Sequence, residues 1–88
     1  MTVKEGFLLR EVGTTKVIIA IGRAARSFHA IAHVNTSGAI IFTGLKNGES
    51  VESIAEKLCS MFRVDADRAR SDVKMFADKL IEVGIMET

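Results

Sequence analysis

Two histidines and one cysteine are the side chains of this chain best suited to bind a metal ion or to act as a nucleophile. His29 and His33 lie four residues apart in a segment whose alternating pattern predicts a β-strand. At ~3.3 Å per residue they are about 13 Å apart, too far for one metal ion to bind both. Cys59 is the only cysteine, so the chain alone forms neither a disulfide nor a four-thiolate metal site. We therefore expect ordinary surface or groove histidines, no metal, and Cys59 as a small buried hydrophobic residue.

Other patterns of catalytic residues are missing from the sequence. It contains no Gly-rich phosphate-binding loop, no pair of histidines on a predicted helix, and no Ser–His–Asp set at a spacing that would support nucleophilic catalysis. With a single cysteine, the chain also lacks the three-cysteine cluster of a radical-SAM enzyme. The sequence therefore predicts a non-catalytic protein without a cofactor.

Length and charge point to one small domain. The chain has 88 residues, with twelve basic and eleven acidic side chains and a net charge of +1. This balance does not suit a protein whose main work is to bind nucleic acid or an anionic membrane. The longest aliphatic run covers residues 17–21, far short of the ~20 residues that span a bilayer, and the first residues lack the apolar region of a signal peptide. We expect a single cytoplasmic domain over residues 1–88.

The elements that must position any site fall into two halves. Phe7–Val12, Lys16–Ile21 and Phe28–Val34 read as strands, with Gly13–Thr14 as a tight hairpin turn and residues 22–26 as a loop. The apolar residues of the second strand are continuous, which favours a central strand covered on both faces. In the third strand, the even-numbered residues 28–34 point one way and His29, Ile31 and His33 point the other.

Three helices follow the strands. Asn35 or Thr36 caps a helix that runs to about Leu45, and the Asn47–Gly48 pair is a C-terminal stop signal. Ser50 caps a second helix, and Asp65 caps a third that runs to about Val83 before Gly84 ends it. The apolar side of the third helix is predicted to hold Ala66, Ala69, Val73, Phe76, Ala77, Leu80 and Val83. Strands within 6–35 and helices within 36–84 predict an α+β fold similar to a winged helix-turn-helix, with a three-stranded antiparallel sheet and three helices.

Three segments, in order and at the right spacing, resemble the coenzyme PQQ synthesis protein D (PqqD) family. Residues 34–38, Val-Asn-Thr-Ser-Gly, resemble its Leu-Asn-x-Thr-Gly motif. Leu45 with Gly48, Ser50, Val51 and Ile54 resembles its passage into the second helix, and the spacing of Asp72, Val73, Phe76, Leu80 and Gly84–Ile85 resembles its ending. Residues 21–25 lack the proline-containing turn of the branch that makes the quinone, so the resemblance is to the broader family.

The resemblance implies a peptide-recognition domain with a defined kind of partner. Such domains bind the leader segment of a ribosomally made precursor peptide and present it to a modifying enzyme, often a radical-SAM enzyme. The leader is held as an extra strand on the edge of the sheet, against the last helix.

The residues themselves suit such a site. The third strand contains no Pro, Lys, Asp or Glu to protect its edge, and Ala30 and Ala32 leave room for another backbone. On the third helix, Met75 lies outside the main apolar stripe among charges of both signs, and Phe76 could form a floor. The predicted peptide-binding residues are His29, Ala30, Ile31, Ala32, His33, Val34, Arg68, Asp72, Met75, Phe76 and Lys79.

Two other functions remain open at this point. One is a winged-helix DNA-binding protein, whose recognition helix would carry Arg68, Arg70, Lys74 and Lys79, although five acidic residues offset them. The other is a structural subunit that forms a homodimer by exchanging strands at its open edge.

Overall fold

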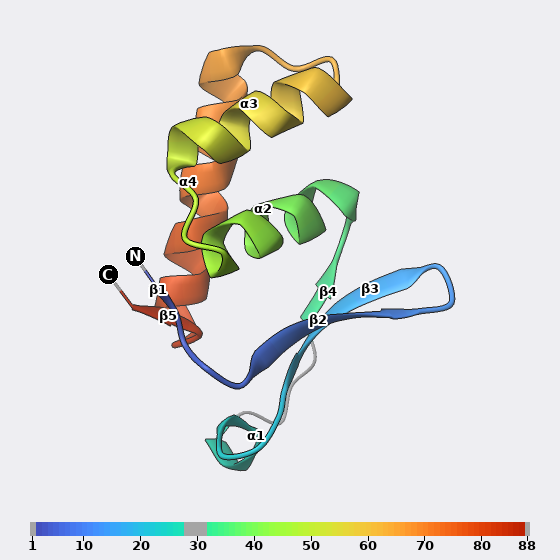
Figure 1. Cartoon of the computed structure of the whole chain (residues 1–88), viewed down its shortest axis with the longest axis vertical. Helices are drawn as coiled ribbons and strands as arrows, with labels where there is room; N and C mark the ends of the chain where they lie inside the picture. Colours follow the sequence, from blue (N-terminus) through green and yellow to red (C-terminus); the bar gives the residue numbers. More distant parts are fainter. Residues whose placement is uncertain (1, 28–31, 88) are drawn as a thin grey trace.

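The structure, a computed structural model, describes residues 2–27 and 32–87. Its elements follow one another along the chain as shown in Figure 1. They are β1 (Thr2–Val3), β2 (Phe7–Val12), β3 (Thr15–Ala20), α1 (Ala24–Ser27), β4 (Ala32–Val34), α2 (Thr36–Lys46), α3 (Val51–Met61), α4 (Ala66–Glu82) and β5 (Met86–Glu87). The α+β fold expected from the sequence is confirmed, with two additional short strands and one additional short helix.

An antiparallel sheet in the order β2-β3-β4 forms one half of the molecule. Gly13, with φ of 64°, begins the two-residue turn that lets Val12 pair with Thr15. That pairing brings Thr15 into β3, so the strand begins and ends one residue earlier than predicted. β3 is central and β4 lies at an edge, as the sequence indicated.

The segment between β3 and β4 differs from the prediction. Residues 22–26 were expected to form a loop, but the chain forms the short helix α1 from Ala24. Ala25 N–H donates to the Gly22 carbonyl (3.2 Å) and Arg26 N–H to the Arg23 carbonyl (3.1 Å), so a single tight turn closes after the positive-φ Gly22. Of the predicted third strand, Ala32–Val34 is confirmed, and residues 28–31 lie outside the described residues.

The three long helices begin where the sequence predicted. The side chains of Asn35, Ser50 and Asp65 each accept a hydrogen bond from the backbone N–H three residues later. These bonds satisfy amide groups that have no partner inside the helix. None of the helices among the described residues is long and apolar enough to cross a membrane.

The chain ends pair with each other in a way that the sequence did not predict. Gly84 adopts a φ of 87° and turns the backbone so that Ile85 N–H donates to the Leu80 carbonyl (2.9 Å). Ile85 and Met86 are buried, and β5 pairs antiparallel with β1 through Val3 and Met86. Two-residue strands are too short to carry a hydrophobic period, so only the folded chain brings them together.

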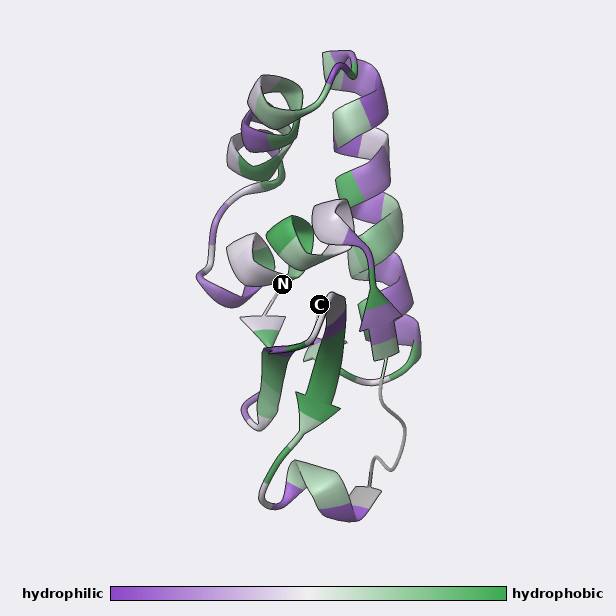
Figure 2. Ribbon diagram, turned by 90° about the vertical axis from the view of Figure 1, so that its right-hand side faces the viewer, coloured by the Kyte–Doolittle hydropathy of each residue, from purple (hydrophilic) through white to green (hydrophobic). Residues whose placement is uncertain are grey.

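The core lies between the sheet and the helices. The hairpin strands are predominantly hydrophobic, whereas α4 carries hydrophobic and hydrophilic stripes (Figure 2). Phe7 and Ile18 of the sheet join Phe42, Ile54 and Val73 of the helices in one buried cluster. The predicted apolar side of α4 is wrong for two residues. Ala66 is exposed in the first turn, and Val83 is 48% exposed where the helix ends. Cys59 is partly buried against the core.

Candidate functional site

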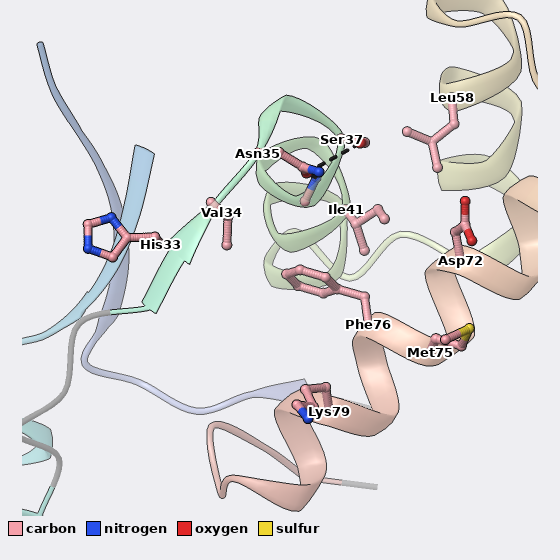
Figure 3. A pocket seen from close by; sticks show the side chains of 11 residues that line it. His33, Val34, Asn35, Ser37, Ile41, Leu58, Asp72, Met75, Phe76 and Lys79 are labelled. Carbon is pink, nitrogen blue, oxygen red and sulfur yellow. Dashed lines mark hydrogen bonds between the residues drawn. The ribbon is translucent and has the colours of Figure 1, made fainter. Parts of the chain in front are cut away.

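A groove of about 550 Å³ separates β4 from α4. Its floor is the first turns of α2, and Leu58 of α3 lies at one end (Figure 3). We call it the β4–α4 groove; it is lined by His33, Val34, Asn35, Ser37, Gly38, Ile41, Leu58, Asp72, Met75, Phe76 and Lys79. The groove therefore adjoins β4, an edge strand beside which residues 2–27 and 32–87 place no further strand.

Hydrogen-bonded and non-bonded residue pairs alternate along antiparallel strands, and this alternation decides which backbone N–H and C=O groups of β4 face that edge. Ile21 N–H donates to the Gly6 carbonyl (2.7 Å), and antiparallel partners alternate between bonded and non-bonded pairs. In this alternation Val17 bonds across to β2, so it does not bond to His33, its register partner on β4. The N–H and C=O of His33 consequently point away from β3, toward the open edge.

Side chains of β4 alternate between the two faces of the sheet. Val34 lies on the side of the helices, whereas the imidazole of His33 lies on the side away from α4 (Figure 3). Val34 packs against the core and is half-buried. His33 thus borders the groove through its backbone, and Val34 through its side chain.

Residues of both charges and of apolar character line the α4 wall. Met75 is 66% exposed and Phe76 is half-buried against the core. Asp72 forms an ion pair with Arg68 one turn earlier (3.4 Å), whereas Lys79 forms no ion pair within residues 2–27 and 32–87. The wall is therefore apolar at its centre, neutralised at one end and positive at the other.

Close contact between α2 and α4 shapes the floor. A Cβ added at Gly38 would lie 3.2 Å from Phe76 Cε2 and 3.2 Å from Val34 Cβ. Glycine at this position lets the Phe76 ring rest directly on the helix backbone. Asn35 Oδ1 accepts from Gly38 N–H (2.8 Å) and from the Ser37 hydroxyl (3.3 Å), which fixes the first turn of α2 beside β4.

The structure brings together most of the predicted site residues that it describes. His33, Val34, Asp72, Met75, Phe76 and Lys79 line the groove. Arg68 reaches it only through its ion pair with Asp72, and Ala32 lies in β4 without lining it. His29, Ala30 and Ile31 lie outside the described residues.

Five lining residues were not among the predicted site residues. Asn35 was predicted only as a helix cap, and Ile41 and Leu58 were not predicted to take part in binding. Ser37 and Gly38 belong to the segment that resembles a family motif, which was the one signal that could have pointed to them. The helical pattern could not reveal them, because it does not show which ends of neighbouring helices meet.

The residues that the structure describes offer no metal site. In the ranges 2–27 and 32–87, no group of three His, Cys, Asp or Glu side chains could hold a metal ion.

Arg70 of α4 pairs with Asp67 and with Glu52 (3.4 Å), and these carboxylates raise the pKa of its guanidinium. Because Arg68 is paired as well, both arginines of α4 are already engaged with carboxylates, which weighs against the reading of α4 as a DNA-recognition helix.

Comparisons with known proteins agree with this architecture. The family model of coenzyme PQQ synthesis protein D matches residues 15–86. The fold is similar to that of a lasso peptide synthetase B1 solved in complex with a leader peptide, with a TM-score of 0.81, 21% identity and coverage of 98% of this chain and 95% of that one. It is also similar to TbiB1 in complex with the TbiA(beta) leader peptide, with a TM-score of 0.77, 17% identity and coverage of 99% and 95%. No curated protein matches the chain.

Proposed function

Because the chain belongs to the coenzyme PQQ synthesis protein D family, we propose that it binds the leader of a ribosomally made precursor peptide. In this proposal the chain is not itself an enzyme. It holds the leader in the β4–α4 groove and presents the peptide to a modifying enzyme of the radical-SAM class. The observation that carries the proposal is the position of the groove beside the open edge of β4. Both similar solved structures hold a leader peptide, which adds support.

Strand addition is the binding mode that this geometry favours. An extended segment beside β4 would exchange backbone hydrogen bonds with the N–H and C=O of His33. Side chains on either side of that contact would point toward the helices, over Val34, Ile41 and Phe76. Main-chain bonds would supply much of the affinity, and the apolar floor would select the side chains.

The opposite edge of the sheet is less suited to accept a strand. On β2, the same alternation turns the backbone groups of Phe7, Leu9 and Glu11 outward. Lys46 Nζ of α2 donates to the Phe7 carbonyl (2.9 Å), which engages the first of these positions. Glu11 places a charge at the other end of the strand. Charged side chains at an edge discourage pairing, so β4 is the favoured edge.

The charges of the α4 wall favour one kind of peptide. Lys79 would attract a carboxylate of the bound segment, while Asp72 is already partnered by Arg68. Met75 is exposed, flexible and polarisable, so it can adapt to the apolar side chain that lies over it.

Titration of the ¹⁵N-labelled chain with the leader of the precursor peptide encoded beside its gene tests the proposal. We expect amide shifts to concentrate at residues 32–34 and along α4 from Asp72 to Lys79. Met75→Glu should weaken binding about tenfold, because it places a charge on the apolar wall. Val83→Glu is the matched control, since Val83 is also exposed at the end of α4 but does not line the groove.

A leader that causes no shifts in β4 or α4, or that binds equally well to the Met75→Glu variant, contradicts the proposal. N-methylation of successive leader amides separates strand addition from side-chain docking alone. Only the methyl groups that block the bonds to His33 should abolish binding.

A further inference from the structure

A second groove, of about 350 Å³, lies on a different side of α2. It is bounded by the β2–β3 hairpin and by the C-terminal half of α3, and it is lined by Leu9, Lys16, Thr36, Ala39, Ile40, Thr43, Gly44, Lys57 and Met61. The two grooves share no lining residue. With 100° between successive residues of a helix, Gly38 and Ile41 face one groove, and Ala39, Ile40 and Thr43 face the other.

Apolar residues dominate this second groove and extend to its rim. Ala39 is buried, and Leu9 and Ile40 are partly buried. Met61 is 60% exposed, and Val64, three residues further along the chain, is 36% exposed. Apolar side chains left exposed together mark interaction surfaces, and methionine suits a surface that adapts to a partner.

The ionisable residues that line the second groove are both lysines. Lys16 pairs with Glu11 (3.7 Å) and Lys57 with Glu49 (2.7 Å), and neither glutamate lines the groove. Pairs at the surface contribute little to stability, and each ammonium has three donors. Each ammonium could therefore bind a carboxylate in the groove in addition to its own glutamate. The lining is complementary to an apolar segment that carries Asp or Glu.

We propose that the second groove docks an acidic, apolar segment of the enzyme that modifies the bound peptide. This inference rests on the proposed function, because a module that presents a peptide needs a surface for the enzyme that the peptide does not cover. The second groove meets that requirement. The enzyme would approach across α2 and the hairpin, while the leader occupies the side of β4 and α4.

Two exposed methionines make a matched pair for the test. Met61 and Met75 are 60% and 66% exposed on helices, and each lines one groove. A phage-displayed random dodecapeptide library is selected on the full chain and counter-selected on its Met61→Glu variant. We expect enriched peptides rich in Asp or Glu and in Leu, Ile or Met, with amide shifts at Ile40 and Thr43. Their binding should weaken about tenfold in Met61→Glu, persist in Met61→Leu, and remain unchanged in Met75→Glu.

Several results overturn the inference. They are a selection that enriches no peptide, enriched peptides that are neutral or basic, and binding that is lost in Met75→Glu instead of Met61→Glu. The Lys57→Gln variant adds a readout, because it should reduce the preference for acidic over neutral versions of an enriched peptide. Failure of the leader titration with a positive result here would overturn the proposed function and leave the chemistry of the second groove standing.

Discussion

Gly38 of α2 lies directly under the ring of Phe76 of α4, so close that a Cβ at position 38 would come within 3.2 Å of Phe76 Cε2. The contact joins two helices at the floor of the β4–α4 groove. It also sets the height of the Phe76 ring above α2, and hence the depth available to a bound side chain.

Gly38→Ala should impair peptide binding more than it impairs folding. Alanine normally stabilises a helix relative to glycine by roughly 1 kcal/mol, and here the close approach opposes that gain. Because Phe76 borders the groove, its ring can move into the groove to relieve that contact, while Val34 Cβ and Asn35 Oδ1, also 3.2 Å from the added Cβ, must give by a few tenths of an ångström. We expect a free energy of unfolding within about 1 kcal/mol of wild type in urea, with leader binding weakened severalfold in the same titration used above.

Gly44→Ala is the contrasting variant. A Cβ at Gly44 would lie 2.6 Å from Ile54 Cγ1, and Ile54 is fully buried and lines neither of the two grooves described above. We expect a loss of about 1–3 kcal/mol in the free energy of unfolding. Equal stability of the two alanine variants would show that the depth of the contact does not govern the outcome.

Asn35→Ala should destabilise the start of α2. The variant removes the oxygen that accepts from Gly38 N–H at 2.8 Å, and the loss of such a cap typically costs about 1 kcal/mol. For a domain of this size, that corresponds to a decrease of roughly 4–8 °C in the melting temperature. Asn35→Asp keeps an acceptor and should retain most of the stability, whereas a melting temperature of Asn35→Ala equal to wild type would rule out the capping role.

Stability should fall in acid in part through Glu49. Hydrogen bonds from Lys57 (2.7 Å) and Ser53 (3.0 Å) hold the pKa of this carboxylate below its ordinary value of 4.5. Because the pKa is lower in the folded state, the stabilisation is present above the unfolded pKa and is lost as pH falls through the folded pKa. The free energies of unfolding of wild type and Glu49→Gln in urea should therefore differ at neutral pH, and the difference should shrink as the solution is made more acidic.

Glu56→Gln is the control for this measurement. Glu56 is exposed on the same helix and forms no ion pair among the residues that the structure describes. Its substitution should leave the pH dependence of wild type unchanged. A difference between wild type and Glu49→Gln that stays constant across this pH range would show that the ion pair with Lys57 does not carry the effect.

Local sequence signals were sufficient for most of the secondary structure. The Gly13–Thr14 turn, the caps Asn35, Ser50 and Asp65, and the stop at Gly84 depend on contacts within a few residues, so the sequence displays them directly. Where the signal was weak, the prediction was wrong. The turn at Ala24–Ser27 was expected to be a loop, and the two-residue strands β1 and β5 were not expected at all.

The candidate groove was predicted in part, for the same reason. The alternation along β4 and the helical period of α4 pointed to Val34, Met75 and Phe76 from the sequence. The periodicities do not show how far apart two elements lie or which ends of them meet. Ser37, Gly38 and Leu58 consequently came to light only in the folded chain.

By itself, the sequence determined where the hairpin turn and the three long helices begin, and most of the apolar residues that are buried. Those properties reside in single residues and in short spacings. The tertiary structure decided that the hairpin register turns the backbone of His33 toward an open edge, that Gly38 allows α4 to close on α2, and that a second groove lies on another side of that helix. These features depend on the packing of segments distant in the chain, where side-chain volume and register, and not local propensity, set the distances.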